Sequence, residues 1–371
     1  MRSVAAQGRH GGRAAAIWPR ILAASAGFGL AATVLPAHAV TIVPTFDSSI
    51  SSSANASTIE TDIDNALTFY GNFSNTDQVD IDFQLAPSGA SYLGGSQSTF
   101  YLAPYAEYTS AMLANATATG NPTALIPYQH LSTGNKADLI LETSADFRAL
   151  GFSGAPGLYS ANGAFDVGGS FDGIVYLNGA DLLGFGGGGD YNPTRVIQHE
   201  VDEVLGIGGS GSVLNIVQQD HLSTPPVYED AGDPDDPLNG DTYIGALDMF
   251  RYSSAGHASL TTSGSASSYF SINGGVTDIA PFNQNSSGDY ADWGGSGCIA
   301  LVQQAFSCSG QSASLTLTSS SPTRNAPDLL LDSPEVIALR TVGYDLPEPA
   351  SIAMLGVSVL GLGWARRRRK G

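Results

Sequence analysis

The sequence predicts an α+β domain with a twisted mixed sheet, one prominent amphipathic helix and a loop-rich C-terminal lobe. Between Ser57 and Leu205, apolar residues at helical spacing alternate with short segments in which they follow strand periodicity. Beyond Gly206 the chain changes character, because runs of Gly, Ser, Asp and Asn replace the periodic stretches. A chain of 371 residues is long enough for one large domain or two modest ones.

The first predicted helix starts at a capping box, Ser57-Thr58-Ile59-Glu60. Its apolar residues recur at helical spacing, and they are Ile59, Ile63, Ala66, Leu67 and Tyr70. A strand follows at Val79 to Leu85, where apolar residues alternate with Asp and Gln. This alternation predicts a half-buried strand.

Three further elements precede the prominent helix. Ala103 to Leu113 has the spacing of a second helix, and Ala137 to Thr143 has the composition of a second strand. Gly173 to Leu177 is a third strand, and Asn178-Gly179 forms the turn after it. The glycine run Gly184 to Gly189 lacks the Lys-Ser/Thr ending of a phosphate loop, so we interpret it as a flexible loop.

The charge of the body is strongly negative. Nine of the fifteen basic residues lie in the two ends of the chain. Between Val40 and Leu346, six basic residues stand against 33 acidic ones, for a net formal charge of −27. Nucleic acids and anionic lipids would repel such a body, so the composition excludes them as partners and favours solvation or divalent cation binding.

The N-terminal end has the composition of an export signal. Arginine-bearing leader residues precede an apolar run from about Ile21 to Leu35, and Ala37-His38-Ala39 matches an A-x-A cleavage site. We therefore predict that residues 1–39 are a signal peptide and that the mature chain begins at Val40.

The C-terminal end combines three short features in a fixed order. Pro347-Glu348-Pro349 precedes the apolar run Ile352 to Trp364, which is followed by the basic cluster Arg366 to Lys370. The apolar run is too short for a comfortable membrane span. This order resembles the PEP-CTERM sorting signal, which implies processing by an exosortase, transient membrane anchoring and a Gram-negative cell surface or matrix. The alternative is a plain tail anchor.

The prominent helix is expected from Pro193 onward, with Asn192 as its N-cap and Pro193 in its first turn. At about 100° per residue, its apolar residues gather on one side. They are Ile197, Val201, Val204 and Leu205. His199, Glu203 and Gly206 gather on the opposite side, which presents two potential ligands one turn apart.

This helix carries the strongest chemical pattern in the chain. His199-Glu200-Val201-Asp202-Glu203 differs by one residue from the zinc-protease pattern HExxH. Side chains at positions i and i+4 can hold one metal ion, and carboxylate oxygen is an acceptable zinc ligand. Glu200 would take a proton from metal-activated water. The alternative is a surface helix with an ordinary histidine and an acidic, solvated face.

A segment further along resembles the Met-turn that underlies the metal in metzincins. Ala246 to Gly256 contains Met249 and Tyr252, although the tyrosine comes one residue later than in the usual form. The alternative is a buried apolar turn with an incidental methionine. The final segment, Pro334 to Leu346, resembles the closing segment of secreted bacterial metallopeptidase domains.

Together these motifs make the chain similar to PEP-CTERM-anchored, zincin-like (metzincin-like) metalloproteases with HExxE in place of HExxH. The resemblance implies a zincin-like domain at 40–346, with an N-terminal lobe at about 40–209, a C-terminal lobe at about 210–346 and a sorting signal at 347–371. It also implies that the strand just before the metal helix, Gly173 to Leu177, is the sheet edge on which a peptide substrate pairs.

The third metal ligand is not fixed by the pattern. Metzincins place a His or Asp three residues beyond the glycine, where this chain has Gly209. His221 is the best replacement by chemistry, and it has Asp220 beside it. Further candidates are Glu229, Asp230 and Asp248. His257 and His130 are expected at the surface.

Two other features concern cofactors and cross-links. The acidic run Asp233 to Asp241 offers oxygen ligands for Ca²⁺ but lacks EF-hand spacing, which favours a solvated loop. Cys298 and Cys308 are the only cysteines, and in an oxidising compartment we expect them to form a disulfide.

Two functions are consistent with the sequence. The first is a secreted zinc-dependent endopeptidase that hydrolyses protein or peptide substrates, with Glu200 as general base and His199, Glu203 and His221 as metal ligands. The second is a catalytically inactive zincin-like protein that binds at the surface or in the extracellular matrix. Glu203 and the missing third histidine favour the second function, whereas retention of Glu200 favours the first.

Overall fold

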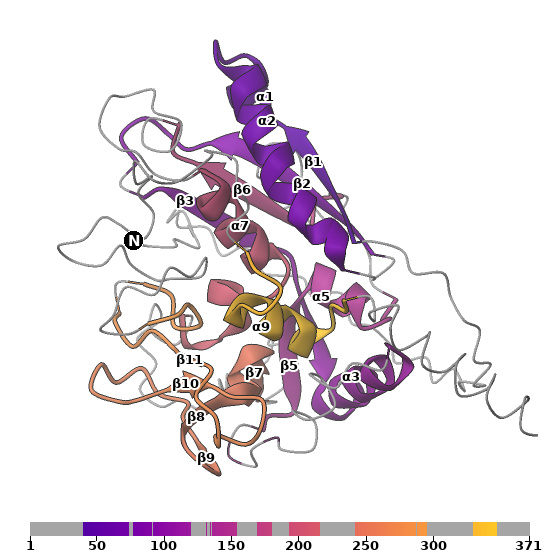
Figure 1. The fold of residues 1–371 in the computed structure, drawn as a ribbon, viewed down its shortest axis with the longest axis vertical. Coiled ribbons are helices and arrows are strands. Elements are labelled where there is room, and N and C mark those ends of the chain that lie inside the picture. Colours follow the sequence, from indigo (N-terminus) through magenta and orange to yellow (C-terminus); the bar gives the residue numbers. More distant parts are fainter. Residues whose placement is uncertain are drawn as a thin grey trace, which may run out of the picture.

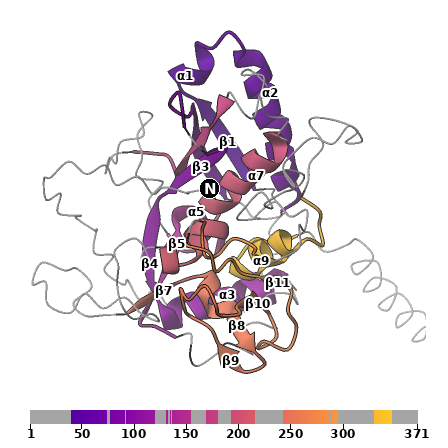
Figure 2. The same cartoon turned by 90° about the vertical axis from the view of Figure 1, so that its left-hand side faces the viewer.

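The computed structural model describes residues 40–73, 77–90, 92–119, 131, 134, 136–153, 169–179, 193–215, 242–286, 288–294 and 329–346. Within them the protein is a mixed α/β structure with open twisted sheets (Figures 1 and 2). None of the described helices is long and apolar enough to cross a membrane. The coarser part of the prediction, a fold of both helices and strands with a twisted mixed sheet, is therefore confirmed.

The largest mixed sheet has the strand order β1-β2-β6-β3. Strands β1 (Thr41–Phe46), β2 (Gln78–Leu85) and β6 (Gly173–Leu177) are parallel, and β3 (Gly94–Ser98) is antiparallel at the edge. The prediction that β6 forms the edge is wrong, because β6 pairs with β2 on one side and β3 on the other. The edge beside the prominent helix is β3.

Two helices lie side by side on one face of this sheet. They are α2 (Ala56–Leu67) and α7 (Pro193–Val204), and α7 also contacts β3 and β6 (Figures 1 and 2). The short helix α1 (Ser48–Ser51) precedes α2, and the 3₁₀ turn η1 (Thr68–Asn72) follows it. The apolar residues predicted for the first helix are buried as expected.

A second sheet has the order β4-β5-β7. Strand β4 (Phe100–Pro104) is antiparallel to β5 (Leu139–Thr143), which is parallel to β7 (Tyr243–Gly245). Helix α3 (Tyr105–Thr119) follows β4, and α5 (Ser144–Ala149) follows β5.

The described part of the C-terminal lobe consists mainly of short elements. Two 3₁₀ turns, η3 (Gly208–Gly211) and η4 (Leu247–Phe250), precede an antiparallel sheet of order β11-β10-β8-β9. Its strands are β8 (Arg251–Ser254), β9 (His257–Ala258), β10 (Tyr269–Phe270) and β11 (Ala280–Pro281). Helix α9 (Pro334–Val342) closes the described chain, and one hydrophobic core includes residues of both lobes.

Among the boundaries that differ from the sequence prediction, two show why. Helix α2 starts after Asn55 rather than at a Ser57 cap, so Ser57 lies inside the helix and the capping-box prediction is wrong. Ala103 belongs to β4 instead of a helix, because Phe100 to Pro104 pair with β5 before the chain turns into α3.

Candidate metal centre

Helix α7 is buried on both faces. Its apolar residues Val201 and Val204 lie in the core, and Glu200 and Glu203 on the opposite face are also almost fully buried. His199 is the residue that retains exposure, with 17% of its side chain accessible. The alternative of a surface helix with a solvated acidic face is therefore wrong, since the acidic face is covered by other elements.

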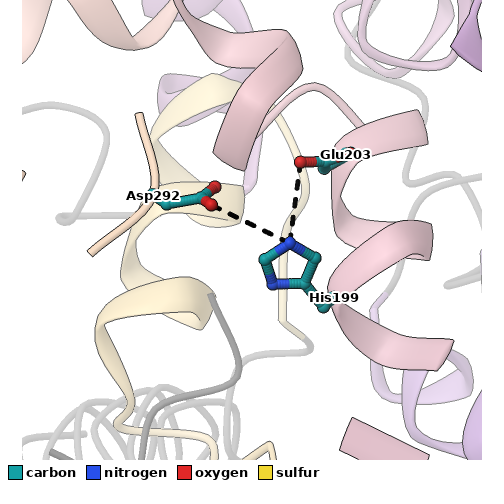
Figure 3. Close-up of side chains that lie close together, drawn as sticks. All are labelled: His199, Glu203 and Asp292. Carbon is teal, nitrogen blue, oxygen red and sulfur yellow. Dashed lines mark ion pairs between the residues drawn. The ribbon is translucent and has the colours of Figure 1, made fainter. Parts of the chain in front are cut away.

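Three potential ligands converge at His199 (Figure 3). Its Nε2 atom lies 3.7 Å from Oε1 of Glu203 and 3.9 Å from Oδ2 of Asp292. One ligand atom from each residue lies within 4.8 Å of the other two. The structure thus brings together the two predicted helical ligand positions and adds an aspartate from the C-terminal lobe that the sequence interpretation missed.

The carboxylate of Glu203 is fixed in place from two sides. The Ser96 hydroxyl on β3 donates a hydrogen bond to Oε2, and the Gly209 backbone N–H donates to Oε1 at 3.1 Å. Because both oxygens accept hydrogen bonds, the side chain keeps one orientation toward His199.

Gly209 stands where the metzincin resemblance places a third ligand, and the structure has no room there for a side chain. A Cβ atom at this position would lie 2.7 Å from Oε1 of Glu203 and 3.0 Å from Cγ of Asp289. The segment that bears Asp289 and Asp292 packs against Gly209, so the third potential ligand comes from this segment.

The aspartate segment is held by contacts to distant parts of the chain. Asn215 donates through Nδ2 to Oδ1 of Asp289 at 2.8 Å and accepts from the Tyr290 backbone N–H at 2.8 Å. Buried Arg251 donates to the Tyr290 carbonyl at 2.7 Å, and its guanidinium lies 4.1 Å from the centre of the Phe282 ring. These contacts place Asp292 opposite α7.

Glu200 lies against the edge strand. A Cβ atom added to Gly94 would come within 2.5 Å of its Oε1 atom, so this close approach requires glycine. Burial raises the pKa of Glu200 well above its usual range, and the charges of Glu203 and Asp289 raise it further. Burial likewise raises the pKa of Asp292, followed by the charges of Asp289, Glu203 and Glu200.

The donor set fits a divalent cation. One imidazole nitrogen and two carboxylate oxygens are ligand types that zinc accepts, and carboxylates also bind harder divalent ions. The second oxygen of Asp292, Oδ1, is buried and accepts no hydrogen bond from the described residues. Because an unpaired buried carboxylate oxygen is costly, a cation held by His199, Glu203 and Asp292 would satisfy this group.

Other sequence-predicted residues have different environments. Asp248 lies outside the cluster, since its carboxylate accepts from the Ser212 hydroxyl and from the backbone N–H groups of Val213 and Gly245. Its role is therefore to join η4 to the chain after η3. His257 is exposed, as expected.

The predicted Met-turn is a tight, buried turn. Met249 is fully buried within η4, and a Cβ atom on Gly211 of η3 would lie 2.8 Å from Cδ1 of Leu247. Both the Met-turn prediction and its alternative, a buried apolar turn, require such burial, so the burial of Met249 does not distinguish them.

Several predictions fall outside the described residues and remain predictions. They concern the signal peptide, the glycine loop, the acidic run, both cysteines and the candidate ligand His221. The same is true of His130, Asp220, Glu229 and Asp230.

Comparison with known proteins identifies the C-terminal signal. Residues 345–369 match the family model of the PEP-CTERM protein-sorting motif. This motif indicates export and cell-surface attachment in Gram-negative bacteria, with exosortase processing and membrane anchoring. Searches of curated proteins and of solved structures found no match.

Proposed function

We propose that this exported protein is a zincin-like, metal-dependent endopeptidase. The observation that carries the proposal is the convergence of His199, Glu203 and Asp292 beside Glu200, at the edge of a mixed sheet. These three side chains would hold the metal, and His221 remains a predicted further ligand.

The topology around the site supports a zincin-like domain. Three parallel strands, an antiparallel edge strand and a helix along that edge bring Glu200 and Glu203 beside β3. An extended peptide that pairs with the outer side of β3 would therefore pass close to Glu200. Gly94 and Gly95 allow its backbone to approach closely.

The chemistry follows from the position of Glu200. A divalent ion, when bound, supplies Lewis acidity toward the peptide carbonyl and the attacking water. Glu200 takes the proton of that water and passes it to the leaving amine. Its burial between α7 and β3 excludes bulk water and orients the carboxylate.

Substitution of the base tests the activity. We expect Glu200→Gln to retain metal and to cleave casein at least about 100-fold more slowly than the wild type, because general base catalysis is lost while the ligands remain. Metal content measured by elemental analysis, together with casein cleavage, checks both parts. Equal cleavage rates would refute the assigned role.

The second function, an inactive surface or matrix binding protein, is favoured by the carboxylate at position 203, where active zinc proteases of the HExxH pattern have histidine. A protein that binds metal but cleaves none of a broad peptide library would support this function.

A further inference from the structure

The two segments that bear the candidate ligands meet at the amide side chain of Asn215. Its Nδ2 atom donates to the Gly209 carbonyl at 3.0 Å and to Oδ1 of Asp289 at 2.8 Å. Its Oδ1 atom accepts from the Tyr290 backbone N–H at 2.8 Å. Gly209 lies just after α7, whereas Asp289 and Tyr290 belong to the aspartate segment, so Asn215 is hydrogen-bonded to both sides of the centre.

Each side of Asn215 leads to a ligand. Gly209, which accepts from Asn215 at its carbonyl, donates its own backbone N–H to Oε1 of Glu203 at 3.1 Å. On the other side, Asp289 begins a turn that ends at Asp292, since the Asp292 backbone N–H donates to the Asp289 carbonyl at 3.4 Å. Glu203 and Asp292 are therefore linked through Asn215 and its neighbours.

The donors and acceptors around Asn215 match an amide in one orientation. A carbonyl and a carboxyl oxygen lie on the Nδ2 side, and a backbone N–H lies on the Oδ1 side. Rotating the amide by half a turn would place acceptor against acceptor and donor against donor. An ionised aspartate would lack both donors, and alanine would lack the whole group. The asparagine side chain therefore satisfies both segments at once.

We infer that Asn215 is a positioning residue that couples metal binding to the docking of the aspartate segment. The inference rests on the metal centre of the proposed function. Helix α7 already fixes His199 and Glu203 relative to one another, whereas Asp292 reaches them from far along the chain. A cation that holds these ligands together favours the arrangement that Asn215 stabilises. By thermodynamic reciprocity, the hydrogen bonds of Asn215 favour binding of the cation.

Removal of the amide tests the inference. Asn215→Ala loses all three hydrogen bonds, so we expect it to bind zinc about 10–100-fold more weakly than the wild type, as is typical when the groups that orient metal ligands are lost. Competition with a chromogenic chelator measures the affinity in the purified protein. Zinc affinity equal to that of the wild type would overturn the inference.

A reciprocal exchange tests the same contact without removing it. Asn215→Asp at pH 8 places a second carboxylate against Asp289 and loses both donors, so it should also weaken zinc binding. When Asn215→Asp is combined with Asp289→Asn, the new amide donates to the new carboxylate, which still accepts from the Tyr290 N–H. We expect the double variant to bind zinc at least about fivefold more tightly than Asn215→Asp. A double variant that binds no more tightly would contradict the coupling.

Hydrogen exchange distinguishes this coupling from a general effect on stability. Zinc should slow exchange of the backbone N–H groups in residues 283–294 of the wild type, and this protection should decrease markedly in Asn215→Ala. Asn115→Ala is the matched control, since Asn115 on α3 donates through Nδ2 to the Gly343 carbonyl at 2.7 Å. It should lower the melting temperature of the metal-free protein and leave zinc affinity and protection unchanged. Zinc-dependent protection that is the same in Asn215→Ala and the wild type would overturn the inference.

These measurements separate the inference from the proposed activity, because they need zinc and no substrate. Weaker zinc binding in Asn215→Ala supports the inference even if the wild type cleaves no casein, in which case the peptidase proposal alone fails. Casein cleavage by the wild type, with unchanged zinc affinity in Asn215→Ala, overturns the inference and leaves the peptidase proposal standing. A wild-type protein that binds no zinc overturns both.

Discussion

At the residue scale, the site depends on small residues as much as on its ligands. Ser96, Gly94 and Gly209 all contact glutamates of α7, yet none belongs to the HExxE pattern. The sequence predicted the pair His199 and Glu203 because their spacing is local and helical. It did not predict Asp292, since this residue lies far along the chain in a segment without periodicity, and the fold alone brings it to His199.

Ser96 should influence metal affinity through Glu203. We expect Ser96→Ala to weaken zinc binding by about tenfold, because loss of a hydrogen bond behind a ligand typically costs this much. Competition with a chromogenic chelator measures the affinity. Gln97→Ala, at the adjacent position of opposite orientation, is the control, and identical affinities of the two variants would contradict the role of Ser96.

At the scale of elements, the edge strand β3 shapes the candidate site as much as helix α7 does. The run Gly173 to Leu177 was predicted with its observed boundaries, but its predicted place at the edge of the sheet was wrong, because a short apolar run does not specify its neighbours. The strand that lies along α7 is β3, whose sequence of Gly, Ser and Gln has little strand propensity. Pairing with β6 and contact with α7 impose its conformation.

Two adjacent glycines of β3 allow a matched test of how the Glu200 carboxylate is positioned. A Cβ at Gly94 would meet Glu200 at 2.5 Å, whereas at Gly95 the nearest atom, on Tyr92, is 3.8 Å away. We expect Gly94→Ala to displace Glu200 and reduce kcat by about tenfold or more, because small misplacements of a catalytic group are costly. Gly95→Ala should retain most activity. Equal effects of the two substitutions on casein cleavage would contradict this placement.

Strand β2 contains a buried acid that the alternating pattern does not reveal. Asp82 is fully buried, with Oδ2 accepting a hydrogen bond from Gln84 Nε2 at 2.7 Å. Burial, with a smaller effect from Asp47, raises the pKa of Asp82 to about 6. The Asp82 carboxyl group therefore binds a proton more tightly in the folded state than in the unfolded state. Protonation of Asp82 favours folding, so its contribution to the free energy of unfolding is fully present below about pH 4 and is lost as the pH rises through about 6.

Replacing Asp82 by a neutral residue should therefore stabilise the fold by an amount that depends on pH. Asp82→Asn should raise the free energy of unfolding by about 1–2 kcal/mol at pH 8, and the gain should shrink toward pH 4. Denaturant unfolding at both pH values checks this, with exposed Asp64→Asn as control. A variant that is less stable than the wild type at pH 8 would show that the ionised carboxylate is stabilising.

At the scale of the whole molecule, the site joins the two parts of the chain. His199 and Glu203 come from α7, whereas Asp292 comes from the C-terminal lobe, and one hydrophobic core includes Val201 and Trp293. The mixed α/β class was predictable from local periodicity, but the convergence of the lobes was not, because it depends on pairings between residues far apart in the sequence. The sorting motif at 345–369 attaches this body to the cell surface.

The central claim is that His199, Glu203 and Asp292 hold one metal ion, and elemental analysis of the purified protein tests it most directly. We expect about one zinc per chain after zinc loading, loss of that zinc in His199→Ala and a marked decrease in Asp292→Asn, because each removes a ligand. His257→Ala, which changes an exposed histidine, should leave the content unchanged. Full zinc content in both ligand variants, or none in the wild type, would contradict the proposed centre.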